Sequence, residues 1–285
     1  MPELPEVQTT VNGLNKTVVS RKIVNISTNY NSPSHAGKDN IKNPKFFTLF
    51  RKKVKGQKIL RAERRAKNVL IHLTGGYTII VHMKMTGHFV YNRPHYPFAR
   101  LDFELDNDKH LVLSDMRKFA KVTLVKTGEL NKSFHIEHLG PEPLDNKFKF
   151  PIFKSQILKR PKGMIKQVLM NQSLISGIGN IYSDEILWRA SVHPLSRPDQ
   201  IPEKNLQTIF KAIKETLKKG ISLGGDSMSD YRNIKGEKGE FQEHHRAYRR
   251  TGKNCSKSGC SGVIKRTVIG ARSAHFCPIH QKLFK

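Results

Sequence analysis

Apolar positions recur with two different periods along the chain. In its first half they alternate with polar ones in short runs, over residues 23–26, 59–63, 68–73, 77–82, 101–106, 110–114 and 121–125. A period of two is typical of half-buried strands. Several short strands at this spacing predict a β-sandwich or a barrel.

Helical periodicity appears before and after this region. Val7, Val11 and Leu14 form an apolar stripe close behind the prolines of the amino terminus, which predicts an amphipathic first helix. After residue 164 the apolar spacing is again three to four, most fully along 206–217. Strands followed by helices predict an α+β protein with more than one domain.

Composition shifts suggest where the domains begin and end. We expect an N-terminal β-sandwich domain over 1–130, a Lys-rich linker over 131–163, a helical domain over 164–250 and a small cysteine-bearing unit over 251–285. Residues 224–253 are Gly-rich, charged and without apolar periodicity. A loop of this length in a compact protein is usually functional or mobile.

The charge balance points to a polyanionic partner. The 285 residues include 51 Lys and Arg against 23 Asp and Glu, a formal charge of +28. An excess of one sign favours nucleic acid as the partner. No apolar run reaches the ~18 residues of a membrane span, and no signal-like segment opens the chain, so we expect a cytoplasmic protein without a membrane partner.

The carboxyl-terminal tail carries a pattern of metal ligands. Cys255 and Cys260 form one close pair, Cys277 and His280 a second, and the apolar run 263–269 before Gly270 predicts a β-hairpin between them. Three thiolates and one imidazole close a tetrahedral Zn²⁺ site, which makes its role structural. The alternatives are that His275 replaces His280 as ligand, or that the three cysteines are simply buried.

The amino terminus offers a candidate nucleophile. Removal of Met1 would expose Pro2 as a secondary amine, which can attack an aldehyde-level carbon and form an iminium. Glu3 and Glu6 are close enough in sequence to act as acid and base on the same centre. The alternative is an ordinary helix start, with proline in the first turn and glutamate at the positive end of the dipole.

Three further residues have a phosphate-binding interpretation beside a plainer one. Asn180 follows a Gly177-Ile178-Gly179 turn at a predicted helix start, where amides and dipole favour an anion. Arg272 stands beyond the predicted hairpin turn and could contact a phosphate with two N–H groups. Lys67 precedes an alternating strand. Plain helix packing and solvated surface charges are the alternatives.

These segments occur together, in one order, in a known family. The start Pro-Glu-Leu-Pro-Glu-Val, residues 64–67, 82–87, 139–144 and 177–185, and the terminal finger resemble the bacterial formamidopyrimidine-DNA glycosylases from residue 2 to about 282. The resemblance implies an N-terminal β-sandwich with flanking helices, then a helix-two-turn-helix module and a zinc β-hairpin finger. It places DNA between the two domains and residues 224–240 over the extruded purine.

The resemblance also implies an activity and a set of site residues. The activity is that of a bifunctional DNA glycosylase and AP lyase, a hydrolase and a lyase, which removes 8-oxoguanine and formamidopyrimidines from duplex DNA in base excision repair. Pro2 would attack C1′, Glu3 would serve as general acid and base, and Lys67 would contact phosphate and assist. The implied DNA-binding residues are Glu6, Met85, Arg117, Phe119, Lys166, Asn180, Tyr182 and Arg272.

Three of these residues have a shared physical rationale. Met85, Arg117 and Phe119 match residues that fill the gap left by an extruded base, and their apolar and planar side chains suit a vacated stack. Arg117 can also pair with the orphaned partner base. We expect a monomer with one structural Zn²⁺, acting on damaged double-stranded DNA in a bacterial cytoplasm and reaching the nucleoid through that DNA.

The sequence departs from the family pattern in a few places. His280 stands where a fourth cysteine is usual, Lys84 stands where a glycine is usual, and residues 224–240 match poorly beyond their Gly-Gly start. The alternatives are an endonuclease VIII-like enzyme for oxidised pyrimidines, a non-catalytic binder of damaged DNA, or an architectural DNA-binding protein. Leu4 and the Arg117-x-Phe119 pair favour the purine branch.

Overall fold

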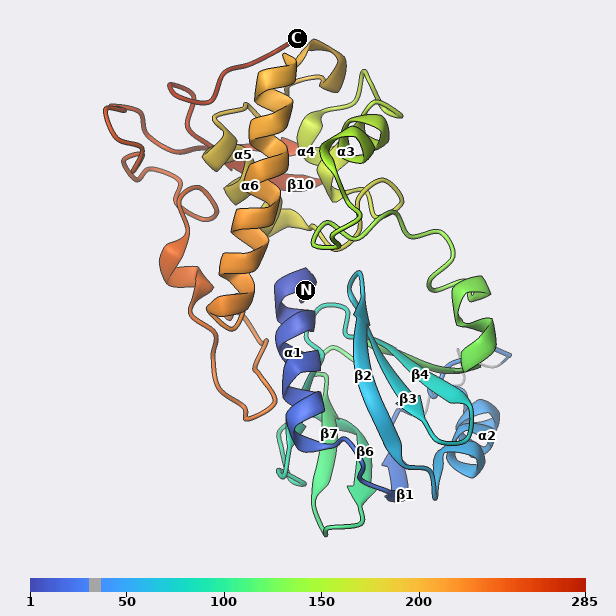
Figure 1. Ribbon diagram of the computed structural model, residues 1–285. Coiled ribbons are helices and arrows are strands. Elements are labelled where there is room, and N and C mark those ends of the chain that lie inside the picture. The colour runs from blue at the N-terminus through green and yellow to red at the C-terminus, as the bar shows by residue number, and fades with distance from the viewer. Residues whose placement is uncertain (31–36) are drawn as a thin grey trace. The chain divides into compact units, whose positions relative to one another are not determined.

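The computed structural model describes residues 1–30 and 37–285, which form two compact units (Figure 1). The first unit comprises Met1–Glu137 and Leu223–Glu240, and the second comprises His138–Ser222 and Phe241–Lys285. Leu223–Glu240 packs with the β-rich unit. The sequence pattern instead places it in the helical domain expected over 164–250. The segment expected to be a linker divides between the two units.

The first unit contains two four-stranded antiparallel sheets. One sheet has the order β1 (Ile23–Thr28), β6 (Ala99–Leu105), β7 (His110–Ser114), β5 (His88–Tyr91). The other has the order β2 (Ile59–Arg65), β3 (Asn68–Leu73), β4 (Tyr77–His82), β8 (Lys121–Lys126). The predicted sandwich is confirmed, and its strands coincide with the alternating runs except for β5. The alternation did not predict β5, because the strand has only four residues and its polar first residue, His88, is buried, so that polar and exposed positions do not coincide.

Two α-helices flank the sheets. The first, α1 (Leu4–Thr17), lies beside β2 (Figure 1) and places its predicted apolar stripe in the core. The second, α2 (Pro44–Val54), was not predicted, because it buries only Phe50 and Val54 and ends in three basic residues. Its start is fixed by Asn43, whose side-chain oxygen accepts the Lys45 N–H at 3.2 Å. A short 3₁₀ helix, η2 (Thr127–Lys132), follows β8.

The second unit is helical with one small hairpin. Its α-helices are α3 (Phe150–Ile157), α4 (Ile165–Met170), α5 (Asn180–Ala190) and α6 (Glu203–Ser222). Its 3₁₀ helices are η3 (Pro198–Gln200) and η4 (Phe241–His244), and β9 (Lys265–Ile269) pairs with β10 (Arg272–Phe276). The stripe expected along 206–217 is buried in α6, as predicted. Among the described residues of both units, no helix has the length and apolar character to cross a bilayer.

The β9–β10 turn explains why a glycine stands at its tip. Gly270 and Ala271 have φ of 55° and 61°, and a two-residue turn with positive φ at both positions matches the twist of antiparallel strands. A Cβ on Gly270 would come within 2.0 Å of Nε2 of Gln167. The finger therefore packs directly on α4, one residue beyond Lys166.

The sequence predicted no regular structure over 224–253. Leu223–Glu240 has no helix or strand, whereas the remainder of the predicted range contains η4. Leu223–Glu240 is nevertheless tied to the sandwich. The Asp226 N–H donates to Oε1 of Glu6 at 2.8 Å, and the Tyr231 hydroxyl donates to the Glu6 carbonyl at 2.9 Å. Gly225 has φ of +86°, and a Cβ there would lie 2.8 Å from Cγ of Glu6. The segment thus needs glycine both for its backbone conformation and for its approach to α1.

We predict that Gly225→Ala loosens this segment more than backbone strain alone explains. Gly76→Ala is the matched control, because Gly76 has φ of +71° with nothing within 4 Å of an added Cβ. The control should lower the free energy of unfolding by about 1–2 kcal/mol, and Gly225→Ala by more. Only Gly225→Ala should speed tryptic cleavage within 223–240. Equal losses and equal cleavage rates would show that the contact with Glu6 is unimportant.

Candidate functional site

The amino end of the chain lies in a charged and buried environment. Pro2 is buried, Glu3 is 3% exposed and Glu6 is 1% exposed. Burial is the main influence on the amine of Met1 and lowers its pKa, the carboxylates of Glu3 and Glu6 raise it, and Lys67 lowers it again. Three residues selected from the sequence for the chemistry at Pro2 therefore have charges that act on the amine next to Pro2.

Local structure fixes each of these groups. Glu3 is the N-cap of α1 and forms a capping box with Glu6, in which the Glu3 N–H donates to Oε2 of Glu6 at 2.7 Å. Lys67 lies in the two-residue turn between β2 and β3, after Ala66 with φ of +55°, and is 6% exposed. The start of α1 therefore has the ordinary capping role that was the alternative interpretation of Glu3 and Glu6. The same capping box also fixes the positions of their carboxylates.

His82 belongs to the same neighbourhood and was overlooked as a single residue. Burial, then the charges of Lys84 and Lys67, lower the pKa of His82 to about 3. The ring is therefore neutral near pH 7, and its Nδ1 accepts the Lys84 N–H at 3.0 Å. Its position at the end of β4, just before the basic Lys84, was the only sequence signal. Lys84 adopts φ of +55°, a conformation that the usual glycine would adopt without strain.

The predicted gap-filling residues lie on two loops of the sandwich with their side chains at the surface. Met85, between β4 and β5, is 37% exposed, and Phe119, between β7 and β8, is 49% exposed. The Arg117 guanidinium carbon lies 4.6 Å from the Phe119 ring centre. Met116, which the sequence reasoning passed over, is 45% exposed on the same loop. Large apolar side chains that face solvent on adjacent loops indicate a binding surface.

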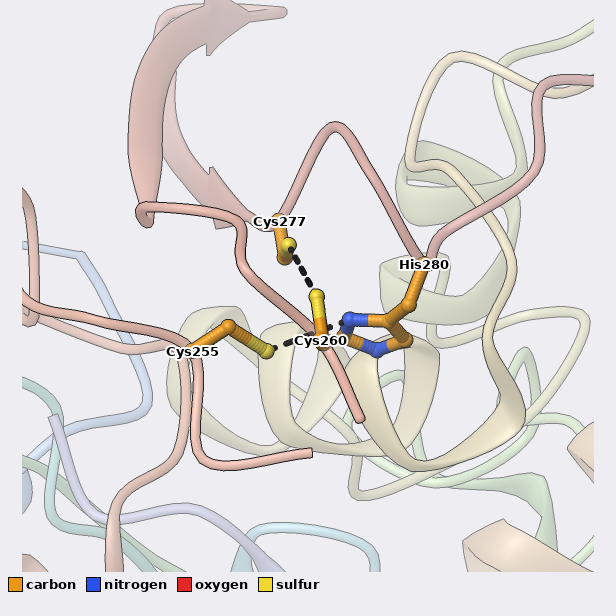
Figure 2. Close-up of side chains that lie close together, drawn as sticks. All are labelled: Cys255, Cys260, Cys277 and His280. Carbon is orange, nitrogen blue, oxygen red and sulfur yellow. Dashed lines mark hydrogen bonds between the residues drawn. The ribbon is translucent and has the colours of Figure 1, made fainter. Parts of the chain in front are cut away.

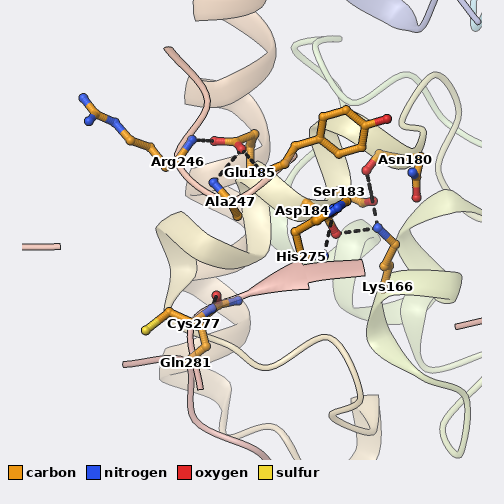
Figure 3. Close-up of polar contacts among 11 residues, drawn as sticks. Lys166, Asn180, Ser183, Asp184, Glu185, Arg246, Ala247, His275, Cys277 and Gln281 are labelled. Atoms are coloured by element: carbon orange, nitrogen blue, oxygen red, sulfur yellow. Dashed lines mark hydrogen bonds and ion pairs between the residues drawn. The ribbon is translucent and has the colours of Figure 1, made fainter. Parts of the chain in front are cut away.

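In the second unit, a buried ion pair organises the predicted phosphate-binding residues (Figure 3). Lys166 on α4 is fully buried and pairs with the Asp184 carboxylate on α5, and its Nζ also donates to the Asn180 carbonyl at 3.4 Å. The second oxygen of Asp184 accepts the backbone N–H and ring Nδ1 of His275 at 3.0 and 2.9 Å. Asp184 therefore joins α4, α5 and β10.

The remaining predicted DNA contacts have different surroundings. Arg272 is exposed at the start of β10. Tyr182 is fully buried, with its ring stacked on Phe241 at 4.7 Å between centres, so its contact with DNA stays a prediction. Glu185, a position that the sequence singled out only as part of a motif, accepts the backbone N–H groups of Arg246, Ala247 and Tyr248 at 2.8–2.9 Å.

The four predicted metal ligands come together at the end of the second unit (Figure 2). The ligand atoms of Cys255, Cys260, Cys277 and His280 all lie within 4.8 Å of one another. Cys255 Sγ is 3.2 Å from Nδ1 of His280, and Cys260 Sγ is 3.6 Å from Cys277 Sγ. Three sulfurs and one nitrogen at these separations can surround one metal ion.

Neighbouring groups orient this cluster for metal binding. The other ring nitrogen of His280, Nε2, lies 3.1 Å from the Trp188 carbonyl, and a proton donated there leaves Nδ1 free to coordinate. Burial lowers the pKa of His280 and so favours its neutral form. The Gly262 N–H lowers the pKa of Cys260. His275, the alternative ligand, is instead bonded to Asp184.

The chain matches two family models. Residues 1–122 match the formamidopyrimidine-DNA glycosylase N-terminal domain, and residues 139–232 match the formamidopyrimidine-DNA glycosylase H2TH domain. It is 37% identical over 290 residues to the formamidopyrimidine-DNA glycosylase of Protochlamydia amoebophila, covering 99% of this chain and 100% of the relative. With that of Pelotomaculum thermopropionicum it shares 35% over 286 residues, covering 99% and 100%.

Solved structures agree with these relatives. A Lactococcus lactis FPG mutant in complex with Fapy-dG-containing DNA matches with a TM-score of 0.87 at 31% identity, covering 99% of this chain and 100% of that one. The Lactococcus lactis Fpg with abasic-site DNA matches with a TM-score of 0.86 at 31% identity, covering 98% and 99%. The chain therefore belongs to the formamidopyrimidine-DNA glycosylase family.

Proposed function

We propose that this protein is a bifunctional DNA glycosylase and AP lyase that removes oxidised purines from duplex DNA. The observation that carries the proposal is the buried surroundings of Pro2, where the charges of Glu3 and Lys67 both act on the adjacent Met1 amine. Family membership supplies the substrate class, since relatives are named for formamidopyrimidine lesions and are solved with damaged DNA. We propose action as a monomer, on DNA in a bacterial cytoplasm.

The first chemical step would use the amine of Pro2 after removal of Met1. The nitrogen lone pair forms a bond to C1′, and the glycosidic bond pair leaves with the base, which takes up the proton that the amine loses. The nitrogen then forms a double bond to C1′ as the C1′–O4′ bond breaks, and Glu3 transfers a proton to O4′. The result is an iminium between Pro2 and C1′. The reference pKa of an α-amino group is about 8, so a useful fraction of Pro2 amine carries a free lone pair at neutral pH.

The iminium then makes strand cleavage possible. Its positive nitrogen acidifies C2′, so loss of a C2′ proton expels the 3′ phosphate and a second elimination expels the 5′ phosphate. Lys67 would stabilise a phosphate next to the lesion, a role supported by the action of its charge on the Met1 amine beside Pro2. Hydrolysis of the iminium releases the remaining sugar carbons as an unsaturated aldehyde, returns Pro2 to its amine form and leaves a gapped strand.

The DNA contacts are assigned by residue type and position. Met85, Arg117 and Phe119 would enter the stack vacated by the damaged base, which their exposure on loops supports. Asn180, at the start of α5, and Arg272, exposed on β10, suit phosphate binding. We keep Glu6, Lys166 and Tyr182 as proposed contacts, although all three side chains are buried in the described structure.

We propose that the Cys255, Cys260, Cys277 and His280 cluster binds one structural Zn²⁺. The donor set of three sulfurs and one imidazole fits zinc, and four protein ligands leave no open position for catalysis. Such a metal would join both ends of the β9–β10 finger and so hold Arg272. The domain boundaries proposed from the sequence, with the finger over 251–285, are compatible with this role.

Covalent catalysis by Pro2 predicts a trapped complex. Borohydride added during turnover should link the amino terminus to DNA, tested on duplexes with 8-oxoguanine, a formamidopyrimidine or an oxidised pyrimidine. Pro2→Gly, or a protein that keeps a residue before Pro2, should lose this product, while a matching carboxyl-terminal extension should not. Intact lyase activity without a free Pro2 amine would overturn the assignment. Trapping on the pyrimidine lesion alone would favour the endonuclease VIII-like alternative.

The zinc proposal predicts different metal contents for two histidine variants. Wild-type protein should contain one equivalent per chain. His280→Ala should lose metal and duplex affinity together, because a coordination bond and the arrangement of Arg272 are lost. His275→Ala should keep one equivalent, since His275 bonds to Asp184 instead. The opposite pattern would make His275 the fourth ligand. Elemental analysis and a duplex titration measure both.

The gap-filling role predicts that Phe119→Ala affects base excision more than strand cleavage. Loss of a stacking aromatic costs on the order of 1–3 kcal/mol, which slows excision roughly ten- to a hundred-fold. Cleavage at a preformed abasic site should suffer less, because extrusion costs less there. Single-turnover rates on the two duplexes test this. Phe134→Ala, at a Phe that is 75% exposed in the same unit, is the control, and equal losses on both substrates would refute the role.

A further inference from the structure

One buried carboxylate connects the two loops that carry the gap-filling residues. Asp115 follows β7 directly, precedes Met116 to Phe119, and is 0% exposed. Its Oδ1 accepts the Thr86 hydroxyl at 2.5 Å, and Thr86 is the neighbour of Met85 on the β4–β5 loop. Its Oδ2 accepts the Ala120 N–H at 2.7 Å, just beyond Phe119. Asp115 therefore contacts the β4–β5 loop and both ends of its own loop.

Thr86 completes the connection between the loops. It is 4% exposed, and its hydroxyl oxygen also accepts the Arg117 N–H at 3.1 Å. The Thr86 hydroxyl thus donates to Asp115 and accepts from Arg117, and so bonds to two residues of the loop between β7 and β8. Met85 is joined to Thr86 by a peptide bond, and Arg117 is joined to it by the hydrogen bond that its N–H donates. A displacement of one loop is therefore transmitted to the other through Thr86.

Three further donors from elsewhere in the first unit bond to Asp115 and to its loop. The Tyr30 hydroxyl donates to Oδ2 of Asp115 at 2.7 Å. Burial, then Asp115, raise the pKa of Tyr30, so the phenol stays protonated and remains a donor. Arg100 donates from Nε to the Asp115 carbonyl at 2.9 Å. Lys42, 6% exposed, donates from Nζ to the Lys118 carbonyl at 2.5 Å.

These contacts hold a loop in a conformation that is unfavourable without them. Lys118 has φ of +56° and lies between Arg117 and Phe119, two of the residues proposed to enter the DNA stack. Non-glycine residues in this region are strained and persist where their surroundings fix them. A buried carboxylate with several donors is a strong fixing point, because charged groups make the stronger hydrogen bonds.

We propose that Asp115 is a positioning residue, which through Thr86 holds Met85, Arg117 and Phe119 in one arrangement for entry into the DNA stack. The inference rests on the proposed function, since it assumes that these three side chains fill the vacated space. It adds that their loops act as one unit, prearranged before DNA arrives. Misplacing such a group by about 1 Å can cost a hundred-fold in rate.

The test compares variants at the bridge on two substrates. Asp115→Asn replaces an acceptor oxygen of the carboxylate by an NH2 donor, and Thr86→Val replaces the hydroxyl by a methyl group. Both changes nearly keep the shape of the side chain, and Thr86→Ser keeps the hydroxyl. The control is Asp102→Asn, on β6, whose carboxylate bonds to His110 at 2.9 Å. Single-turnover excision from an 8-oxoguanine duplex should fall about ten- to a hundred-fold in Asp115→Asn and Thr86→Val. Cleavage of a preformed abasic duplex should change less than about threefold, and Thr86→Ser and Asp102→Asn should resemble wild type.

A second readout does not depend on bond cleavage. In a Glu3→Gln background, which lacks the proposed general acid, 2-aminopurine opposite the lesion reports unstacking by its fluorescence. Asp115→Asn should slow or reduce this signal while duplex affinity stays within about threefold of the parent.

The outcomes separate this inference from the function it rests on. Equal losses on both duplexes, or unchanged fluorescence in a thermally stable Asp115→Asn protein, would overturn the positioning role while wild-type excision stands. Wild-type protein that cleaves neither duplex would instead refute the proposed function. If Asp115→Asn does not fold, the comparison of Thr86→Val with Thr86→Ser decides the question, because Thr86 carries the link between the loops.

Discussion

The carboxylate of Glu6 is the interaction on which the first unit's candidate site depends. One of its oxygens accepts the Glu3 N–H and the other accepts the Asp226 N–H. A single buried group therefore fixes the start of α1, the backbone that carries the terminal amine, and the beginning of Leu223–Glu240. An acid at this position does more than complete a capping box, because it ties the amino end to a segment more than two hundred residues away.

A second buried carboxylate has a comparable position in the other unit. Asp184 neutralises Lys166 and fixes His275, so that α4, α5 and β10 share one polar centre. Removing one partner of a buried pair leaves a charge without compensation, which costs several kcal/mol. The protein thus uses acidic residues, scarce in a chain of charge +28, at points where several elements meet.

The sequence predicted the repeating parts of the fold well and the isolated parts poorly. Alternation located most of the strands, but β5 was too short and α2 too basic for a periodic signal. The clustering of Cys255, Cys260, Cys277 and His280 was predicted from their spacing, whereas the fold was needed to separate His280, in the cluster, from His275, which bonds to Asp184. Partners far apart in sequence, such as Asp115 with Tyr30 or Asp184 with His275, carry no local pattern. Their burial arises only when the elements pack.

The contact between His280 and the Trp188 carbonyl links the proposed metal site to the stability of the second unit. The cluster is attached to the end of α5, so a metal bound there stabilises the folded unit by mass action. That contribution grows with the logarithm of free metal concentration, to about 4 kcal/mol when the concentration is a thousand times the dissociation constant. With zinc bound as proposed, the thermal stability of the helical unit would depend in part on the metal supply of the cell.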